Sequence, residues 1–321
     1  MDFIITGATG WLGRSIVKEL LSGRSRWLNG QNVNSLRLLV EKSQAEHAPK
    51  EWNDPRLQII YGDITKPADL APLFAGLKGP VVIHTAGLIH PRRVKDFFAV
   101  NVDGTMNLYN AAKSNRAKRM VVLSSNSPIG VSRRTDEIFD ENSPYHPYMN
   151  YGLSKQKMEE ALLAQGEPPE KLVILRAPWF YGPEQPARQT LFFQMIEKGK
   201  FPVVGRGQAM RSMSYIENLV QGVLRAATHP TPKSSIYWIA DKRPYSMQEV
   251  VQTVGKVLAE DFRRPVKEGN PQLPGVISDV AECVDAVIQK FGFYHQKIHV
   301  LSEMNKTIAT TRLTRAASLI A

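Results

Sequence analysis

Cysteine is almost absent from this sequence, whose 321 residues contain only Cys283. A lone cysteine cannot form an internal disulfide or build a thiolate metal site. We therefore predict no metal centre, and a reducing, cytoplasmic compartment is the default expectation. Cys283 itself is expected to be a packed thiol inside a helix.

Long apolar runs are also missing. No segment approaches the roughly 20 apolar residues that a helix needs to cross a bilayer, so the sequence excludes a membrane-spanning protein. The first ten residues, MDFIITGATG, offer neither a basic start nor a long apolar stretch, and we expect no secretory signal there. With 43% hydrophobic and 22% charged residues, the chain has the composition of a globular protein.

Acidic residues are fewer than basic ones, 30 against 41, which gives a net charge of +11. Between Arg92 and Arg134, nine basic residues face only Asp96 and Asp103. Such a segment could attract nucleic acid, anionic lipid or a phosphate-bearing small molecule, or it could be a set of solvated helix faces. Because no nucleic-acid motif accompanies the charge, we predict no nucleic-acid partner.

Short apolar runs alternate with helical patterns in the first half of the chain. Apolar spacing such as Leu12, Ile16 and Leu20 indicates helices between the runs, while the polar segment 24–35 is expected to be a loop. This alternation predicts an α/β fold with a doubly wound parallel sheet. The expected strands are residues 2–6, 36–40, 57–61, 81–84, 120–124 and 172–176.

A glycine-rich motif opens the first expected helix, with Gly7, Gly10 and Gly13 in the run TGATGWLG. Gly7 permits a tight turn, Gly10 lets the backbone approach a pyrophosphate, and Gly13 lets the helix pack close to the sheet. The phosphate would then lie on free amide donors at the positive end of the helix. The placement between strand and helix predicts a dinucleotide site rather than a plain tight turn.

Tyr151 and Lys155 are four residues apart in an expected helix, so both project from one face. A tyrosine with a pKa of about 10 is a poor base near neutrality, and a nearby ammonium favours its phenolate. The pair indicates acid/base chemistry, although a surface pair on an amphipathic helix is the alternative. Ser124 and Ser125 end an expected strand, where ligands bind in parallel sheets, but serines also cap turns.

Together these residues resemble the extended short-chain dehydrogenase/reductase family, in its epimerase/dehydratase and 3β-hydroxysteroid-dehydrogenase-like branch. Further matches follow in order along nearly the whole chain, at residues 62–64, 84–87, 101–105, 176–178, 181–183 and 215–218. The resemblance implies a dinucleotide-binding Rossmann domain over residues 1–180. It implies a smaller, partly helical domain for substrate over residues 181–321, with some elements returning to the first. The last stretch, 310–321, has helical spacing, and because the family usually continues beyond it we expect a shortened end.

The resemblance also implies roles for single residues. Tyr151 would be the general acid/base, Lys155 would lower the pKa of that tyrosine and bind the nicotinamide ribose, and Ser125 would hold the substrate oxygen. Aligning the stretch 125–130 favours Ser125 over Ser124 and Ser127. The residues expected to bind the cofactor are Gly7, Thr9, Gly10, Trp11, Leu12, Gly13, Glu41, Asp63, Ile64, Thr85, Ala86, Gly87, Asn101, Tyr151, Lys155 and Pro178.

Two stretches point to different substrates. Trp179 and Phe180 stand where nucleotide-sugar members often carry an asparagine, so these aromatics indicate either a more apolar substrate or a different packing wall. Arg211, at the end of the run GRGQAMR, instead resembles the sugar-nucleotide pattern whose arginine binds a diphosphate.

The cofactor choice depends on Glu41, which follows the second strand. A carboxylate there would bind both ribose hydroxyls and repel a 2′-phosphate, whereas Lys42 or Arg14 could bind that phosphate. A solvated loop charge is the remaining alternative for Glu41. We predict NAD, with NADP as the other option.

These observations lead to an oxidoreductase that moves a hydride between nicotinamide and a secondary alcohol or ketone of a small-molecule substrate. The alternative is a nucleotide-sugar epimerase or dehydratase with tightly bound NAD. A cofactor-sensing module without catalysis would be expected to lack Tyr151 or Lys155, and both are present. A homodimer is compatible with the sequence.

Overall fold

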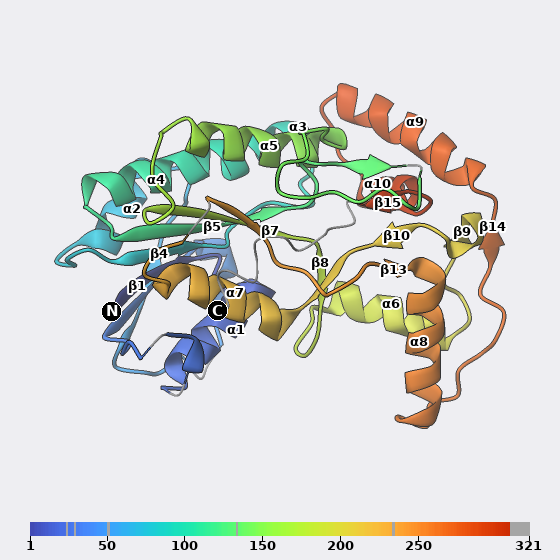
Figure 1. Ribbon diagram of the computed structural model, residues 1–321, viewed down its shortest axis with the longest axis horizontal. Helices are drawn as coiled ribbons and strands as arrows, with labels where there is room; N and C mark the ends of the chain where they lie inside the picture. Colours follow the sequence, from blue (N-terminus) through green and yellow to red (C-terminus); the bar gives the residue numbers. More distant parts are fainter. Residues whose placement is uncertain (24, 29, 50–51, 133, 233–234, 309–321) are drawn as a thin grey trace.

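A parallel sheet forms the centre of the computed structural model, which describes residues 1–23, 25–28, 30–49, 52–132, 134–232 and 235–308. In this part of the chain seven strands pair in the order β12-β7-β5-β4-β1-β2-β3 (Figure 1). Their bounds are β1 Asp2–Thr6, β2 Ser35–Val40, β3 Leu57–Tyr61, β4 Val81–His84, β5 Arg119–Ser125, β7 Leu172–Ala177 and β12 Ile236–Trp238. All six expected strands are confirmed to within one residue at either end, and β12 is added to them. The order reverses between β1 and β4, which is the doubly wound arrangement predicted from the sequence.

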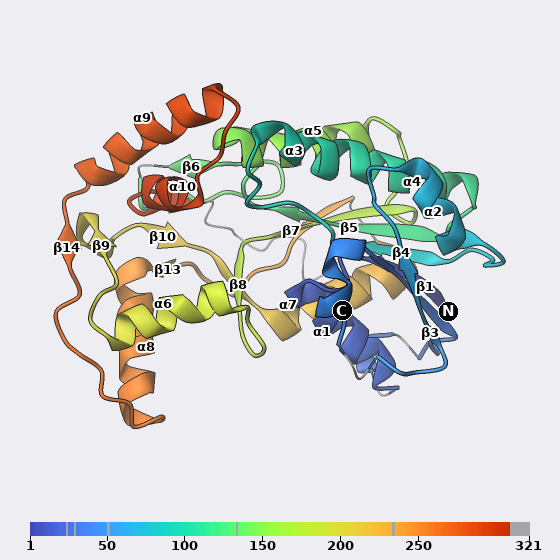
Figure 2. The same ribbon diagram turned by 180° about the vertical axis from the view of Figure 1, so that it is seen from behind.

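Helices cover both faces of this sheet because successive strand side chains point to opposite sides. Phe3 and Ile5 of β1 join one apolar core, and Ile4 between them joins the other. The first core packs under α1 (Trp11–Leu21) and α7 (Ile216–Thr228). The second packs under α2 (Pro67–Phe74), α4 (Thr105–Ser114) and α5 (Met149–Leu163), as Figures 1 and 2 show from opposite sides.

The chain between β4 and β5 is helical from Val94 to Ser114, but this run is not uniform. It begins as α3 (Val94–Phe98), passes through a π-helical segment, η3 (Ala99–Gly104), and continues as α4. Single π turns inside α-helices frequently occur at functional sites. Asn101 lies within this turn and is fully buried.

The smaller part of the molecule, at the right in Figure 1, consists of helices and very short strands. Its helices are α6 Ala187–Glu197, α8 Met247–Glu260, α9 Val276–Lys290 and α10 Gln296–Glu303. Its strands are β6 Val131–Ser132, β8 Trp179–Tyr181, β9 Val203–Val204, β10 Met210–Arg211, β11 Met213–Tyr215, β13 Tyr245–Ser246, β14 Gln272–Leu273 and β15 Thr307–Ile308. Although α7 and β12 come after residue 180, they belong to the large sheet layer. The boundary at residue 180 stays a prediction.

Three short 3-10 segments complete the described elements: η1 Arg26–Leu28, η2 Lys42–His47 and η4 Gly205–Gly207. The first lies in the segment expected to be a loop, where it buries Leu28 against the core. Within the described ranges no helix is long and apolar enough to span a membrane. The helix expected at 310–321 lies outside the described residues.

The prediction for Cys283 is half wrong. The residue is helical, in α9, but its thiol is exposed rather than packed. The reason is that the inward side of α9 is largely polar: Asp285 and Gln289 are buried there and hydrogen-bonded. Apolar residues such as Val280 face solvent instead, so apolar character does not mark the packed side of this helix.

Candidate active site

The glycine loop, residues 7–13 from the end of β1 into the first turn of α1, can take only glycine at two of its positions. Gly7 has a φ of 75°, and a Cβ built on it would lie 2.5 Å from the backbone nitrogen of Ala86. A Cβ on Gly13 would lie 2.1 Å from the carbonyl oxygen of Gly7. Gly10 is the N-cap of α1, and no side chain caps it, so the first amides of the helix are available to an anion. This cradle fits a dinucleotide pyrophosphate.

The loop after β4 lies against the glycine loop, at the edge where the sheet order reverses. Thr85 donates its hydroxyl to the carbonyl oxygen of Thr6 at 2.9 Å, and Ala86 touches Gly7. A Cβ built on Gly87 would lie 3.2 Å from Nζ of Lys155. The loops after β1 and β4 and the helix α5 therefore meet at one place.

The side chain of Asn101 forms hydrogen bonds to both the loop after β4 and helix α5. Its Oδ1 accepts from the amide of Leu88 at 2.8 Å, and its Nδ2 donates to the carbonyl oxygen of Leu88 at 3.0 Å and to Oγ of Ser154 at 3.0 Å. The side chain thus ties the loop after β4 to helix α5. The cofactor contact expected of Asn101 stays a prediction.

Residues after β2 and β3 form the far side of the expected cofactor site. Glu41 is exposed, precedes η2 and accepts a hydrogen bond from Ser43 at 2.8 Å. Thr9 of the glycine loop donates to Gln44 at 2.6 Å, which joins the glycine loop to η2. Asp63 accepts from both the amide and the hydroxyl of Thr65, at 2.9 and 2.8 Å, so its carboxylate shapes its own loop. Ile64 packs on Gly104.

Tyr151 and Lys155 both lie on α5, as predicted. The Tyr151 ring is 5.8 Å from that of Phe97, and the Lys155 ammonium donates to the carbonyl oxygen of Leu123 at 3.1 Å. Lys155 is 5% exposed, and burial lowers its pKa to about 8. Across the described residues it makes no ion pair within 4 Å, although the Glu159 carboxylate acts to raise its pKa. A Cβ on Gly152 would lie 2.6 Å from the carbonyl oxygen of Ser127, so α5 runs close along the segment after β5.

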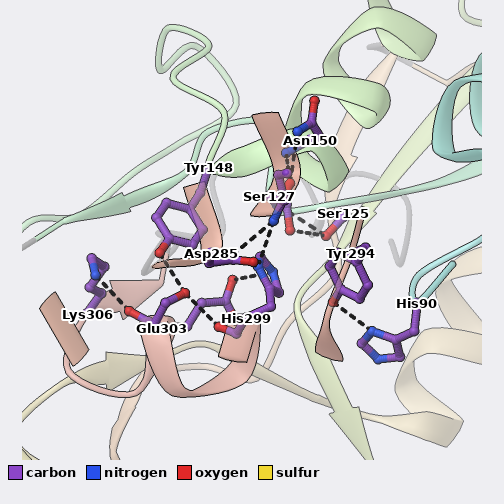
Figure 3. A network of polar contacts seen from close by, with 12 residues as sticks. His90, Ser125, Ser127, Tyr148, Asn150, Asp285, Tyr294, His299, Glu303 and Lys306 are labelled. Atoms are coloured by element: carbon purple, nitrogen blue, oxygen red, sulfur yellow. Dashed lines mark hydrogen bonds and ion pairs between the residues drawn. The ribbon is translucent and has the colours of Figure 1, made fainter. Parts of the chain in front are cut away.

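The two serines at the end of β5 have different surroundings. Ser124 donates to the carboxylate of Glu159, which is itself fully buried and paired with Arg176 at 2.7 Å. Ser125 instead lies 3.1 Å from the hydroxyl of Ser127 and accepts from the Ser127 amide at 3.2 Å (Figure 3). The geometry therefore supports the preference for Ser125 over Ser124, and it leaves Ser127 beside Ser125.

The buried pair of Glu159 and Arg176 was not expected from the sequence. Glu159 follows Lys155 by four residues and Tyr151 by eight, which extends the same helical face by another turn. That spacing is the signal that could have revealed it. His84 is a second buried polar residue: it contacts Thr6 at 2.6 Å and Thr105 at 2.8 Å, and burial lowers its pKa to about 3.

The expected substrate residues point in different directions. Phe180 packs on Trp11, with ring centroids 5.1 Å apart, whereas Trp179 meets Phe192 edge-on at 5.4 Å in the smaller part. Trp11 also donates to the carbonyl oxygen of Pro183 at 2.8 Å. Trp11 therefore supports the segment after β7, which starts with the buried Pro178, while its neighbour Leu12 is buried in the core.

Arg211 lies further along, in β10, where it pairs with β13 and β15. Its guanidinium donates to the carbonyl oxygen of Glu303 at 3.0 Å. Burial lowers the pKa of this arginine, although the Glu303 carboxylate acts in the other direction. The side chain is thus a partly buried cation on β10, a strand that lies between β13 and β15.

Comparison with known proteins identifies the chain at the level of its family. The model of the NAD dependent epimerase/dehydratase family matches residues 3–240. The chain belongs to this family. It is 46% identical over 310 residues to the uncharacterized protein y4nL of Sinorhizobium fredii, covering 95% of this chain and 86% of the relative.

Two further relatives show the breadth of the family. The chain is 30% identical over 270 residues to a 3 beta-hydroxysteroid dehydrogenase/Delta 5→4-isomerase of Mycobacterium tuberculosis, covering 78% of this chain and 68% of the relative. The structure of a UDP-glucose 4-epimerase of Thermotoga maritima shares the fold with a TM-score of 0.69 at 18% identity, covering 85% of this chain and 86% of that one. The predicted family, the doubly wound fold and an NAD-dependent enzyme are confirmed. The roles of single residues stay predictions.

Proposed function

We propose that this enzyme transfers a hydride between NAD and a secondary alcohol or ketone carbon, with Tyr151 as the general acid/base. The observation that carries the proposal is the environment of Lys155. Its ammonium is buried without an ion pair among the described residues, beside Gly87 and the carbonyl oxygen of Leu123. Burying an unpaired charge is costly, and such groups cluster at functional sites.

Lys155 supports two tasks from this position. With a pKa of about 8, its side chain is mostly protonated at neutrality. It can donate to a ribose hydroxyl of a cofactor held along the Gly7 and Gly87 loops. On the same helical face as Tyr151, its charge also favours the phenolate.

The remaining residues complete the reaction. Bound NAD supplies the carbon that accepts or returns the hydride. In the oxidation direction, Tyr151 takes the hydroxyl proton while the carbon–hydrogen bond breaks and the carbonyl bond forms, so no free alkoxide builds up. Ser125 holds the substrate oxygen by a hydrogen bond, and Ser127 at 3.1 Å keeps the Ser125 hydroxyl in place.

We favour release of the oxidised or reduced product, which makes the enzyme a dehydrogenase or reductase. The aromatic pair Trp179 and Phe180 supports an apolar substrate, and a relative at 30% identity is a 3 beta-hydroxysteroid dehydrogenase/Delta 5→4-isomerase. Arg211 favours a second candidate, a nucleotide-sugar epimerase. This partly buried cation donates to the neutral carbonyl oxygen of Glu303, and a substrate diphosphate would give it a charge-assisted hydrogen bond in addition.

The experiment that separates the two candidates starts with freshly purified protein. Denaturation followed by chromatography identifies the retained cofactor: an empty, exchangeable site supports the dehydrogenase, and firmly retained oxidised NAD supports the epimerase. Competition by UDP and GDP against a panel of secondary alcohols and ketones gives a second test. If a diphosphate binds, Arg211→Ala weakens it by about tenfold to a hundredfold, while the exposed neighbour Arg206→Ala leaves it unchanged. Strong inhibition by either diphosphate would refute the dehydrogenase proposal.

The proposal extends to cofactor choice, compartment and assembly. Glu41 at the end of β2 supports NAD over NADP. The single cysteine supports a reducing cytoplasm. A homodimer is supported by the solvent face of α9, where Val276, Val280 and Val287 are each more than half exposed, and light scattering tests it.

A further inference from the structure

Helix α5 does not cap its own N-terminus. Its N-cap residue, Tyr148, makes no side-chain cap, and the next residue, Met149, has a φ of 52°, which is unfavourable for a side chain of this kind. The amide of Asn150 instead donates to Oε1 of Gln289 at 3.1 Å, and the Asn150 side-chain amide donates to the same oxygen at 2.9 Å. Gln289 lies on α9, 139 residues later. The cap of the helix that carries Tyr151 therefore comes from the C-terminal helices.

Asp285 decides which way the Gln289 amide points. Nε2 of Gln289 donates to Oδ2 of Asp285 at 2.9 Å, and both side chains are buried. A carboxylate only accepts, so it must face the NH2 end of the amide, which turns the oxygen toward Asn150. If the Gln289 side-chain amide were reversed, its NH2 group would face the two N–H donors of Asn150 at the start of α5, and neither side could accept.

His299 of α10 holds Asp285 in turn. Its Nδ1 lies 2.7 Å from Oδ2 of Asp285, and its Nε2 lies 3.5 Å from Glu303. Burial acts to lower the pKa of His299, but Asp285 and Glu303 outweigh burial and raise it. The result is a buried chain of polar contacts from α10 through α9 to the first turn of α5, which Figure 3 shows from close by.

Aromatic contacts connect the same elements by a second path. Tyr294 lies with its ring 5.2 Å from His299 and 5.3 Å from Phe97, and Phe97 contacts Tyr151. The Tyr294 hydroxyl is 2.9 Å from Nδ1 of His90 (Figure 3). The start of α5 contacts Gln289 and the Phe97 ring contacts Tyr294, and chains of contacts connect both of these residues to His299 of α10.

We propose that Gln289, oriented by Asp285 and His299, is a positioning residue that fixes Tyr151 relative to Lys155. Tyr151 lies in the first turn of α5, which frays when uncapped, whereas Lys155 lies one turn further in and is anchored at Leu123. Loss of the cap therefore separates the pair. The inference rests on the proposed role of Tyr151 as general acid/base.

The test follows the Tyr151 phenolate directly, without a substrate. Its absorbance near 295 nm is titrated in the NAD-bound protein as the difference between a chain with Tyr151 and the matching Tyr151→Phe chain. In Gln289→Leu we expect the titration midpoint to rise by at least about half a pH unit, because the phenolate loses its cation. NAD affinity should stay within about twofold, because Lys155 and the glycine loop remain. If the Gln289→Leu protein does not fold, the same titration is made with Gln289→Met, whose side chain is similar in length to that of glutamine.

Three further variants distinguish a role in positioning Tyr151 from a general contribution to the stability of the fold. Ser278→Ala removes a buried hydrogen bond of 2.7 Å between α9 and the carbonyl oxygen of Ser302 but touches no part of α5, so it should lower stability without moving the midpoint. Asp285→Leu should move the midpoint as the Gln289 variants do. Asp285→Asn, which keeps an oxygen acceptor, should not.

An equal shift in Ser278→Ala, or no shift in the Gln289 variants, would overturn the inference. Failure of the proposed function looks different: the wild-type Tyr151 would then titrate like a free tyrosine. A wild-type midpoint below that of free tyrosine, unmoved by Gln289 substitution, contradicts only the positioning role.

Discussion

Replacing Lys155 with methionine is expected to stabilise the protein while removing its activity. Burial lowers the pKa of Lys155 from 10.5 to about 8, so the fold carries this charge at a disadvantage. Since one pKa unit corresponds to about 1.4 kcal/mol, the disadvantage is about 3 kcal/mol at neutral pH. Methionine fills similar space without a charge. Loss of the hydrogen bond to Leu123 removes about 1 kcal/mol, which leaves a net gain of about 2 kcal/mol.

The gain should depend on pH in a definite direction. Between pH 8 and 10.5 the unfolded chain binds more protons at Lys155 than the folded one, so the free energy of unfolding of the wild type rises there. The Lys155→Met variant lacks this titrating group, so its free energy of unfolding does not show this rise. The advantage of the variant should therefore be fully present at pH 7 and gone by about pH 10, where the hydrogen bond to Leu123 that the variant lacks offsets what remains of the charge penalty.

Urea unfolding of both proteins at pH 7 and pH 10 measures this difference, and NAD titration measures the loss of cofactor affinity. Lys157→Met, on an exposed position of the same helix, is the control and should change stability little at either pH. A Lys155→Met protein that is less stable than wild type at pH 7, or a difference that does not shrink with pH, would refute the reasoning.

Three other outcomes are expected. Tyr151→Phe should keep NAD affinity but lose about 10²- to 10⁴-fold in turnover, measured on the best substrate of the alcohol and ketone panel; retained turnover would argue against the assigned chemistry. Glu159→Gln should destabilise the fold by about 3–5 kcal/mol in urea unfolding, because it leaves the buried Arg176 without its charge partner. Fluorescence titration should show NAD bound at least about tenfold more tightly than NADP, and Glu41→Ala should narrow that ratio; tighter NADP binding would contradict the role of Glu41.

The sheet and the cofactor side of the site could be predicted because their signals are local. Each core strand is a short apolar run, and the glycines fall at fixed spacing between a strand and a helix. The ends of parallel strands then bring residues such as Thr85 and Ser125 to one edge. A Cβ on Gly13 would lie 2.1 Å from the carbonyl oxygen of Gly7, which is why this position of the spacing requires glycine.

The smaller part of the molecule could not be predicted in the same way. Its strands are two or three residues long, too short for any alternation to show. Helix α9 turns polar side chains inward, so its pattern gave the wrong face for Cys283. The contact of Gln289 with Asn150 joins distant segments through single side chains, and no local pattern marks it.

That contact has a consequence for the growing polypeptide. Synthesis proceeds at about 5–20 residues per second, so the ribosome needs about 7 to 28 seconds to pass from Asn150 to Gln289. During that interval the nascent chain already carries the glycine loop, Tyr151 and Lys155, but the start of helix α5 lacks its hydrogen bond to Gln289. We therefore expect translation products that stop before α9 to lack activity even where they bind NAD. Competence for the reaction would then arrive late, after most of the enzyme has been made.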